Sequence, residues 1–96
     1  MSKGNEYTLK EAIEQMLHTY RLDGKLKEVA LIQSWEKVMG PAIQKYTRGL
    51  RIVNRVLYVE IASAPLREEL MYGRSRIVQL LNEAAGEQVI DEVVLR

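Results

Sequence analysis

The sequence predicts an α+β domain in which a three-stranded sheet has helices packed on one face. Three observations support this fold class. The 96 residues can enclose one hydrophobic core but hardly two. The hydrophobic share of 47% and the charged share of 28% are typical of folded globular chains. Apolar residues follow helical periodicity in the first half, alternate with period two in the middle, and return to helical periodicity before a β-rich end.

Two helices are predicted in the N-terminal part of the domain, which we expect to span residues 8–96 after a mobile arm at residues 1–7. The first helix begins at Thr8–Glu11, which has the spacing of a capping box, and stops at Asp23–Gly24. The second carries an apolar stripe up to Gly40–Pro41, a pair that breaks helices. Together these two helices would form a helical hairpin.

A short helical turn and a β-hairpin are predicted next. Pro41 can open a further helical turn that runs as far as Tyr46. Leu50–Val53 and Val56–Ile61 are rich in β-branched residues and alternate as strands do. Asn54–Arg55 between them is a candidate two-residue turn, although arginine tolerates positive φ poorly, and a longer loop is the alternative.

The last helix and a third strand complete the prediction. Ser63 is an N-cap candidate, and apolar residues keep helical spacing from Leu66 to Ala84 before Gly86 ends the helix. Gly73 lies inside this stretch, so the helix either bends there or begins again after it. The residues 89–95 favour a strand whose facing the sequence leaves open.

The chain lacks the patterns that most enzymes and metal sites need. With no cysteine and His18 as the one histidine, disulfides, thiol catalysis and cysteine-ligated zinc are excluded. The adjacent carboxylates of Glu68 and Glu69 point apart on a helix, and phosphate-binding glycine motifs are absent. We therefore expect no enzymatic activity, no cofactor, no metal and no small-molecule ligand. The polar N-terminus and the lack of a membrane-length apolar run predict a cytoplasmic protein without a membrane partner.

Charge is distributed unevenly, although the net charge is only +1. Residues 37–59 contain several basic side chains and no acidic one, whereas residues 83–96 are mostly acidic. Cations bind phosphates and tyrosine rings stack on bases, so this mixture favours nucleic-acid binding. The candidate nucleic-acid-binding residues are Lys45, Arg48, Arg51, Arg55, Tyr58, Arg67 and Arg74. Alternatively, these charges keep an exposed strand soluble and protect a sheet edge from pairing.

Helical spacing also suggests roles for two arginines, the tryptophan and the methionines. Arg67 and Arg74 are seven residues apart, so a continuous helix would place them on one face. Trp35 has helical spacing to other apolar residues and is interpreted first as a core residue, with an exposed partner anchor as the alternative. Met39 and Met71 are interpreted as core fillers.

Ordered features from Leu26 onward carry a family resemblance. They are Trp35 to Ile43 (WEKVMGPAI), Tyr46-Thr47, Leu57 to Leu66 (LYVEIASAPL), Arg67 to Leu70 (REEL) and Ile77 to Asn82 (IVQLLN) before Gly86. With these features the chain resembles the DciA family of bacterial replicative-helicase operators. The resemblance implies a K-homology-like αββαβ domain and a protein without catalytic residues that associates with the replicative DNA helicase and with DNA. The GxxG loop of RNA-binding K-homology domains is absent.

Two functional hypotheses follow. The leading one is a nonenzymatic adaptor of DNA replication that binds single-stranded or duplex DNA, mainly through phosphates, and associates with the replicative DNA helicase. The alternative is a protein-interaction module that meets the helicase or another copy of itself without binding nucleic acid. Its apolar surface would lie around Trp35 and Met39 or along an open sheet edge.

Overall fold

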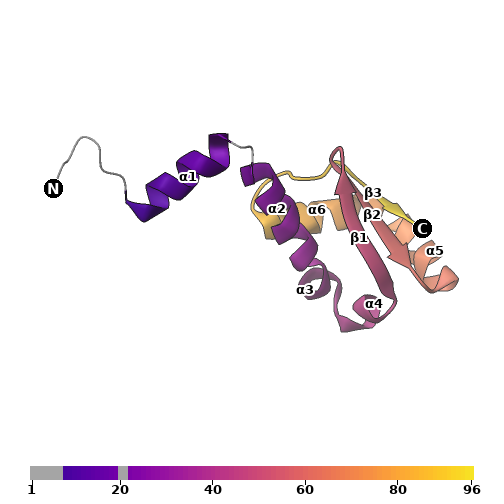
Figure 1. Cartoon of the computed structure of the whole chain (residues 1–96). Helices are drawn as coiled ribbons and strands as arrows, with labels where there is room; N and C mark the ends of the chain where they lie inside the picture. Colours follow the sequence, from indigo (N-terminus) through magenta and orange to yellow (C-terminus); the bar gives the residue numbers. More distant parts are fainter. Residues whose placement is uncertain (1–7, 20–21) are drawn as a thin grey trace.

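The computed structural model describes residues 8–19 and 22–96 as helices around a three-stranded sheet (Figure 1), which confirms the predicted α+β class. The elements are α1 (Leu9–Thr19), α2 (Leu22–Gln33), α3 (Trp35–Met39), α4 (Pro41–Lys45), β1 (Thr47–Val53), β2 (Val56–Ile61), α5 (Ala64–Tyr72), α6 (Arg74–Ala85) and β3 (Glu92–Leu95). The predicted arm at residues 1–7 lies outside the described residues.

Helix α1 begins where the sequence predicts. The Thr8 amide donates a hydrogen bond to Glu11 Oε1 at 3.0 Å, and the Glu11 amide donates to Thr8 Oγ1 at 3.0 Å. This reciprocal pairing is a capping box. Hydrogen bonds from the Thr8 amide and hydroxyl also lower the pKa of the Glu11 carboxyl, because they stabilise its charged form.

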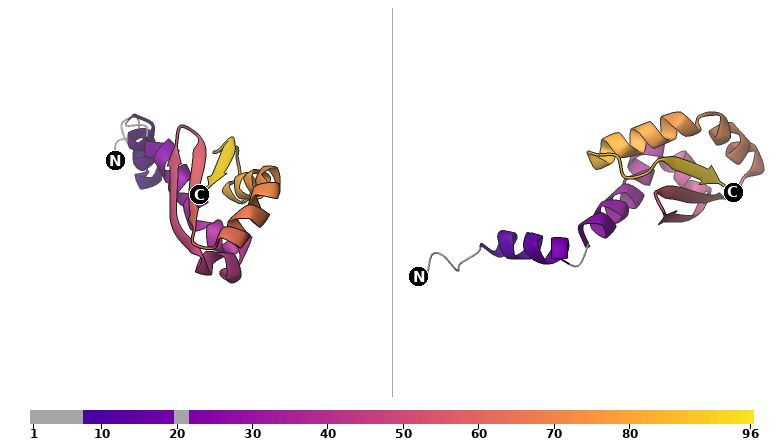
Figure 2. Two further views of the ribbon diagram at one scale, coloured as in Figure 1. Left: turned by 90° about the vertical axis from the view of Figure 1, so that its right-hand side faces the viewer. Right: turned by 90° about the horizontal axis from the view of Figure 1, so that it is seen from above.

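The predicted end of the first helix is wrong, and so is the helical hairpin. Asp23 and Gly24 lie inside the first turn of α2 and therefore form no stop. Glycine in a helix costs only about 1 kcal/mol relative to alanine, which the remaining turns can offset. Figures 1 and 2 show α1 beyond the N-terminal end of α2 instead of alongside it. Leu9 in α1 is accordingly 78% exposed.

The second predicted helix is divided at Ser34 into α2 and α3, and its side chains reach the sheet. Trp35 at the start of α3 is buried, and its Nε1 donates to Thr47 Oγ1 at 3.0 Å. The Thr47 hydroxyl in turn donates to the Ile43 carbonyl of α4 at 2.9 Å. Trp35 is thus a core residue that fixes α3 and α4 to the start of β1. Its alternative role as an exposed partner anchor is wrong.

The sheet has the order β1-β2-β3, with β1 and β2 antiparallel and β2 and β3 parallel. Inward-facing residues of β2 and β3, together with residues of α2, α3, α6 and the segment before β3, form the buried core: Leu31, Trp35, Leu57, Val59, Ile61, Ile77, Leu81, Val89, Ile90, Val93 and Leu95. The alternate strand residues make up the other side, which we call the open face: Arg51, Val53, Val56, Tyr58, Glu60, Glu92 and Val94. This arrangement confirms that the helices pack on one face.

The β-hairpin has the two-residue turn, and the longer loop is not formed. Asn54 and Arg55 have φ values of 51° and 66°, so both adopt the left-handed conformation that a tight hairpin turn requires. A non-glycine residue in this region carries about 1 kcal/mol of strain or more. Contacts of the Arg55 side chain, described below, offset that strain.

After β2, the predicted long helix begins again after Gly73, which was one of the two alternatives. The last strand, however, differs from the prediction. The long helix stops at Tyr72 and begins again after Gly73, which gives α5 and α6. Strand β3 is shorter than the predicted residues 89–95. The Asn82 side chain accepts hydrogen bonds from the amides of Val89 and Ile90, so these two residues pair with α6 instead of with β2. The parallel pairing also settles the facing of β3, because Val93 and Leu95 are buried.

Candidate nucleic-acid interface

The centre of the open face is a tyrosine ring with arginines over it. Arg51 in β1 lies opposite Tyr58 in β2, and its guanidinium carbon is 5.9 Å from the centre of the Tyr58 ring. Arg96, directly after β3, approaches the same ring to 4.9 Å. Cation–π attraction at these distances holds both guanidinium groups over a half-buried ring. The open face therefore presents two positioned cations from opposite edges of the sheet.

Two more basic residues of the predicted set lie at the start of β1. Lys45 is exposed at the end of α4, with its Nζ 5.8 Å from the centre of the Tyr46 ring. Arg48 is exposed at an irregularity in the β1–β2 register, where the pairing shifts between Thr47 and Gly49. Such bulges redirect side chains at sheet edges. Lys45 and Arg48 are thus exposed cations at the end of β1 that lies away from the hairpin turn.

Arg55, in contrast, is held by an acidic partner. Its Nε and one terminal nitrogen donate to the two carboxylate oxygens of Asp91 at 2.9 and 3.1 Å, and the same terminal nitrogen donates to the Gln88 carbonyl at 3.1 Å. The hydrogen bonds from Arg55 lower the pKa of the Asp91 carboxyl, with a smaller contribution from Gln88. The Asp91 amide also donates to the Arg55 carbonyl at 2.8 Å. Arg55 therefore joins the hairpin turn to the segment that enters β3.

Arg67 lies in the first half of α5 and Arg74 is the first residue of α6. Because the chain breaks at Gly73, the two arginines do not share the face of one continuous helix as predicted, yet both line the same surface hollow. One terminal nitrogen of Arg67 donates to the Ile61 carbonyl at 2.7 Å. The Ile61 amide donates to the Arg96 carbonyl at 2.8 Å, so Arg67 and Arg96 flank the same end of β2.

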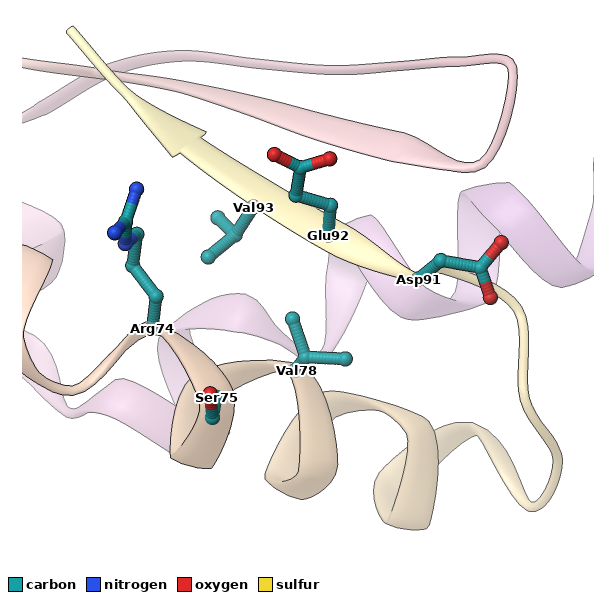
Figure 3. A pocket seen from close by; sticks show the side chains of 6 residues that line it. All are labelled: Arg74, Ser75, Val78, Asp91, Glu92 and Val93. Atoms are coloured by element: carbon teal, nitrogen blue, oxygen red, sulfur yellow. The ribbon is translucent and has the colours of Figure 1, made fainter.

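Arg74 also borders a second hollow, which is less suited to phosphate. This cleft of about 360 Å³ runs between α6 and β3. Figure 3 shows Arg74 at one end of it and Asp91 at the other, with Val78 and Val93 between them, while the Glu92 carboxylate lies on the side of β3 away from α6. Among the described residues that line this cleft, Arg74 is the one cation, and a single cation attracts a phosphodiester chain only weakly. The K-homology type of clamp is also lacking, because the α5–α6 turn reads Gly73-Arg74-Ser75-Arg76 without a second glycine.

Comparison with protein-family models identifies the chain. The model described as "Dna[CI] antecedent, DciA" matches residues 8–95. The chain belongs to the DciA family. Proteins of the DciA family are bacterial loaders of the replicative helicase in DNA replication; they associate with a DnaB-type helicase and are not enzymes. No curated protein and no solved structure matches the chain.

Metal-binding clusters and membrane-length apolar helices are not found among the described residues. Within residues 8–19 and 22–96, no group of three or more histidine, aspartate or glutamate side chains is arranged to hold a metal ion. None of the described helices has the length and apolar character that crossing a bilayer demands. The open face instead carries Arg51 and Arg96 over the Tyr58 ring.

Sequence reasoning missed Arg96 as a component of the candidate interface of this DciA protein. It was assigned to the acidic C-terminal region, since the facing of the last strand was open. Arg96 is two residues from Val94, which pairs with Tyr58. Once the parallel register is known, the period-two spacing places Arg96 on the same face as Tyr58, one pair farther along β2.

Proposed function

We propose that this DciA-family protein binds DNA through the open face of its sheet while it serves the replicative helicase. The observation that carries the proposal is the Tyr58 ring with Arg51 and Arg96 over it. Guanidinium groups held against a ring lose less freedom when they meet a phosphate than unrestrained ones, which lowers the cost of binding. Lys45 and Arg48 add exposed cations at the end of β1 that lies away from the hairpin turn.

The sequence pattern supports the same surface. Residues 37–59, which contain α4, β1 and most of β2, have no acidic side chain. The open face itself has two carboxylates, Glu92 at the start of the edge strand β3 and Glu60 on the central strand β2, two residues beyond Tyr58. We infer that phosphate contacts concentrate around the Tyr58 ring and on the β1 side of the face. Contacts of this kind are made to phosphates and not to base edges, so the binding would tolerate any sequence.

The remaining predicted residues receive different roles in this proposal. Arg55 holds the hairpin turn through Asp91, and we do not place it among the DNA contacts. Arg67 and Arg74 form the rim of a separate surface that is treated below. As a partner of the bacterial helicase, the protein would act in the cytoplasm.

Charge reversal tests the DNA proposal. Arg51→Glu and Arg96→Glu should each weaken single-stranded DNA binding, and the double variant should lose affinity on the order of 100-fold, since hydrogen bonds to charged groups contribute roughly 1.5–3 kcal/mol each. The slope of log affinity against log salt should also fall by roughly 0.7 for each lost contact. Fluorescence anisotropy with a labelled oligonucleotide measures both quantities.

Arg76→Glu is the matched control, because it makes the same charge change at an exposed position on α6. It should leave affinity within about threefold of the wild type, the loss that a nonspecific change of net charge would produce. Binding that ignores salt, or an Arg76→Glu loss equal to that of Arg51→Glu, would contradict the proposal.

A further inference from the structure

A second surface lies where α5 meets α6. We call it the elbow, and it is a hollow of about 540 Å³ lined by Ala64, Arg67, Glu68, Met71, Tyr72 and Arg74. Tyr72 is 85% exposed and Met71 is 44% exposed. The prediction that Met71 fills the core is therefore wrong. Two adjacent large side chains on the surface at a helix end form an exposed apolar patch.

Folding does not account for this exposure. Helix α5 contacts the core through Leu66 and Leu70, which are half-buried against it. Its cap is also complete, because Ser63 Oγ accepts a hydrogen bond from the Leu66 amide. Met71 and Tyr72 thus add no core contact that the helix needs, and polar residues at both positions would leave α5 in place.

The rim of the elbow has a definite charge pattern. Arg67 is oriented by its 2.7 Å hydrogen bond to the Ile61 carbonyl, and Arg74 lines the same hollow from the start of α6. An apolar centre with arginines at its rim complements a partner segment that carries an apolar side chain flanked by carboxylates. Tyrosine, methionine and arginine are also the residue types enriched in protein interfaces.

The elbow fits protein better than DNA. Glu68 also lines the hollow, so a phosphodiester chain, which carries a charge at every nucleotide, would meet its carboxylate. A protein segment can instead place its carboxylates beside the arginines and an apolar side chain at the centre. The open face differs, since its two central arginines converge on one ring at 5.9 and 4.9 Å.

We propose that the elbow docks the replicative DNA helicase, by receiving an apolar side chain of an acidic helicase segment between Met71 and Tyr72. The inference rests on the helicase association of the DciA family and is independent of the proposed DNA binding. The partner's carboxylates pair with Arg67 and Arg74 at the rim, while its apolar side chain covers the exposed Tyr72 ring.

Binding of the full chain to the purified replicative helicase of the same organism tests this inference. Tyr72→Ala should weaken binding at least about tenfold, as expected for a central aromatic anchor, and Arg74→Glu should weaken it severalfold. Leu26→Ala is the matched control, because Leu26 is an apolar residue on α2 that is 52% exposed. It should leave helicase binding unchanged. All three positions are exposed, so melting temperatures should stay close to that of the wild type.

The same variants are then measured against single-stranded DNA. The inference predicts that Tyr72→Ala binds DNA as well as the wild type does. Helicase affinity within twofold of the wild type for both Tyr72→Ala and Arg74→Glu would overturn it. Loss of DNA binding in Tyr72→Ala with unchanged helicase binding would also overturn it and would assign the elbow to nucleic acid. If the open-face variants do not affect DNA binding, the proposed DNA-binding function fails, but the helicase measurements still test the elbow.

Discussion

The open face and the elbow contain the same two residue types, arginine and tyrosine, in opposite arrangements. On the open face the Tyr58 ring is half-buried and two arginines lie over it, so the surface presents charge. At the elbow the Tyr72 ring is 85% exposed and the arginines stand at the rim, so the surface presents an apolar ring. Burial of the aromatic residue, and not composition, distinguishes the surface that we propose for phosphate from the one that we propose for protein.

Substitutions in the hairpin turn give the largest expected effect on stability. They also test whether Arg55 is a structural residue or part of the open-face DNA contacts. Arg55→Ala removes the pairing with Asp91 and keeps a non-glycine residue at φ 66°. Arg55→Gly loses the same pairing and relieves the backbone strain. We therefore expect Arg55→Ala to be less stable than Arg55→Gly by about 1 kcal/mol in urea denaturation.

The pH dependence of the same variants is the control. Because the folded-state pKa of Asp91 is lowered, the stability from its pairing is present above the unfolded-state pKa and is lost as pH falls through the folded-state value. The difference between the wild type and Arg55→Gly should thus shrink on acidification below about pH 4. At neutral pH, folded Arg55→Gly should bind DNA as the wild type does. A loss of DNA affinity there would return Arg55 to the phosphate contacts.

Removing a carboxylate should change DNA affinity by a smaller amount, and the change should occur on the open face but not at the elbow. Glu60→Gln on the open face should strengthen DNA binding by a few fold, because it deletes a negative charge one pair along β2 from the Tyr58 row. Glu68→Gln makes the same change at the elbow and should leave DNA affinity unaltered. Anisotropy titrations at low salt measure both variants, and equal gains from the two would break the distinction between the surfaces.

Local features of this fold were predictable from the sequence, because they depend on neighbours along the chain. The Thr8–Glu11 capping box, the turn at Asn54–Arg55 and the restart after Gly73 are all of this kind. The error at Asp23–Gly24 has a local cause as well, since a helix can absorb the small cost of one glycine.

Features that depend on distant residues were not predictable. The pairing of Arg55 with Asp91 joins positions 36 residues apart. The contact of Arg96 with Tyr58 requires the parallel register of β2 and β3, which no local pattern specifies. The exposure of Met71 depends on which side of α5 the core lies. Most of the candidate residues were therefore identified from the charge pattern, while their grouping into two surfaces required the fold.

Chemical-shift mapping of the isotope-labelled chain during titration with a single-stranded oligonucleotide tests the two-surface account most directly. The account predicts that the backbone amides of Arg51, Tyr58 and Arg96 shift progressively, whereas those of Met71 and Tyr72 stay in place. Shifts centred on Met71 and Tyr72, with the amides of the open face unmoved, would contradict it.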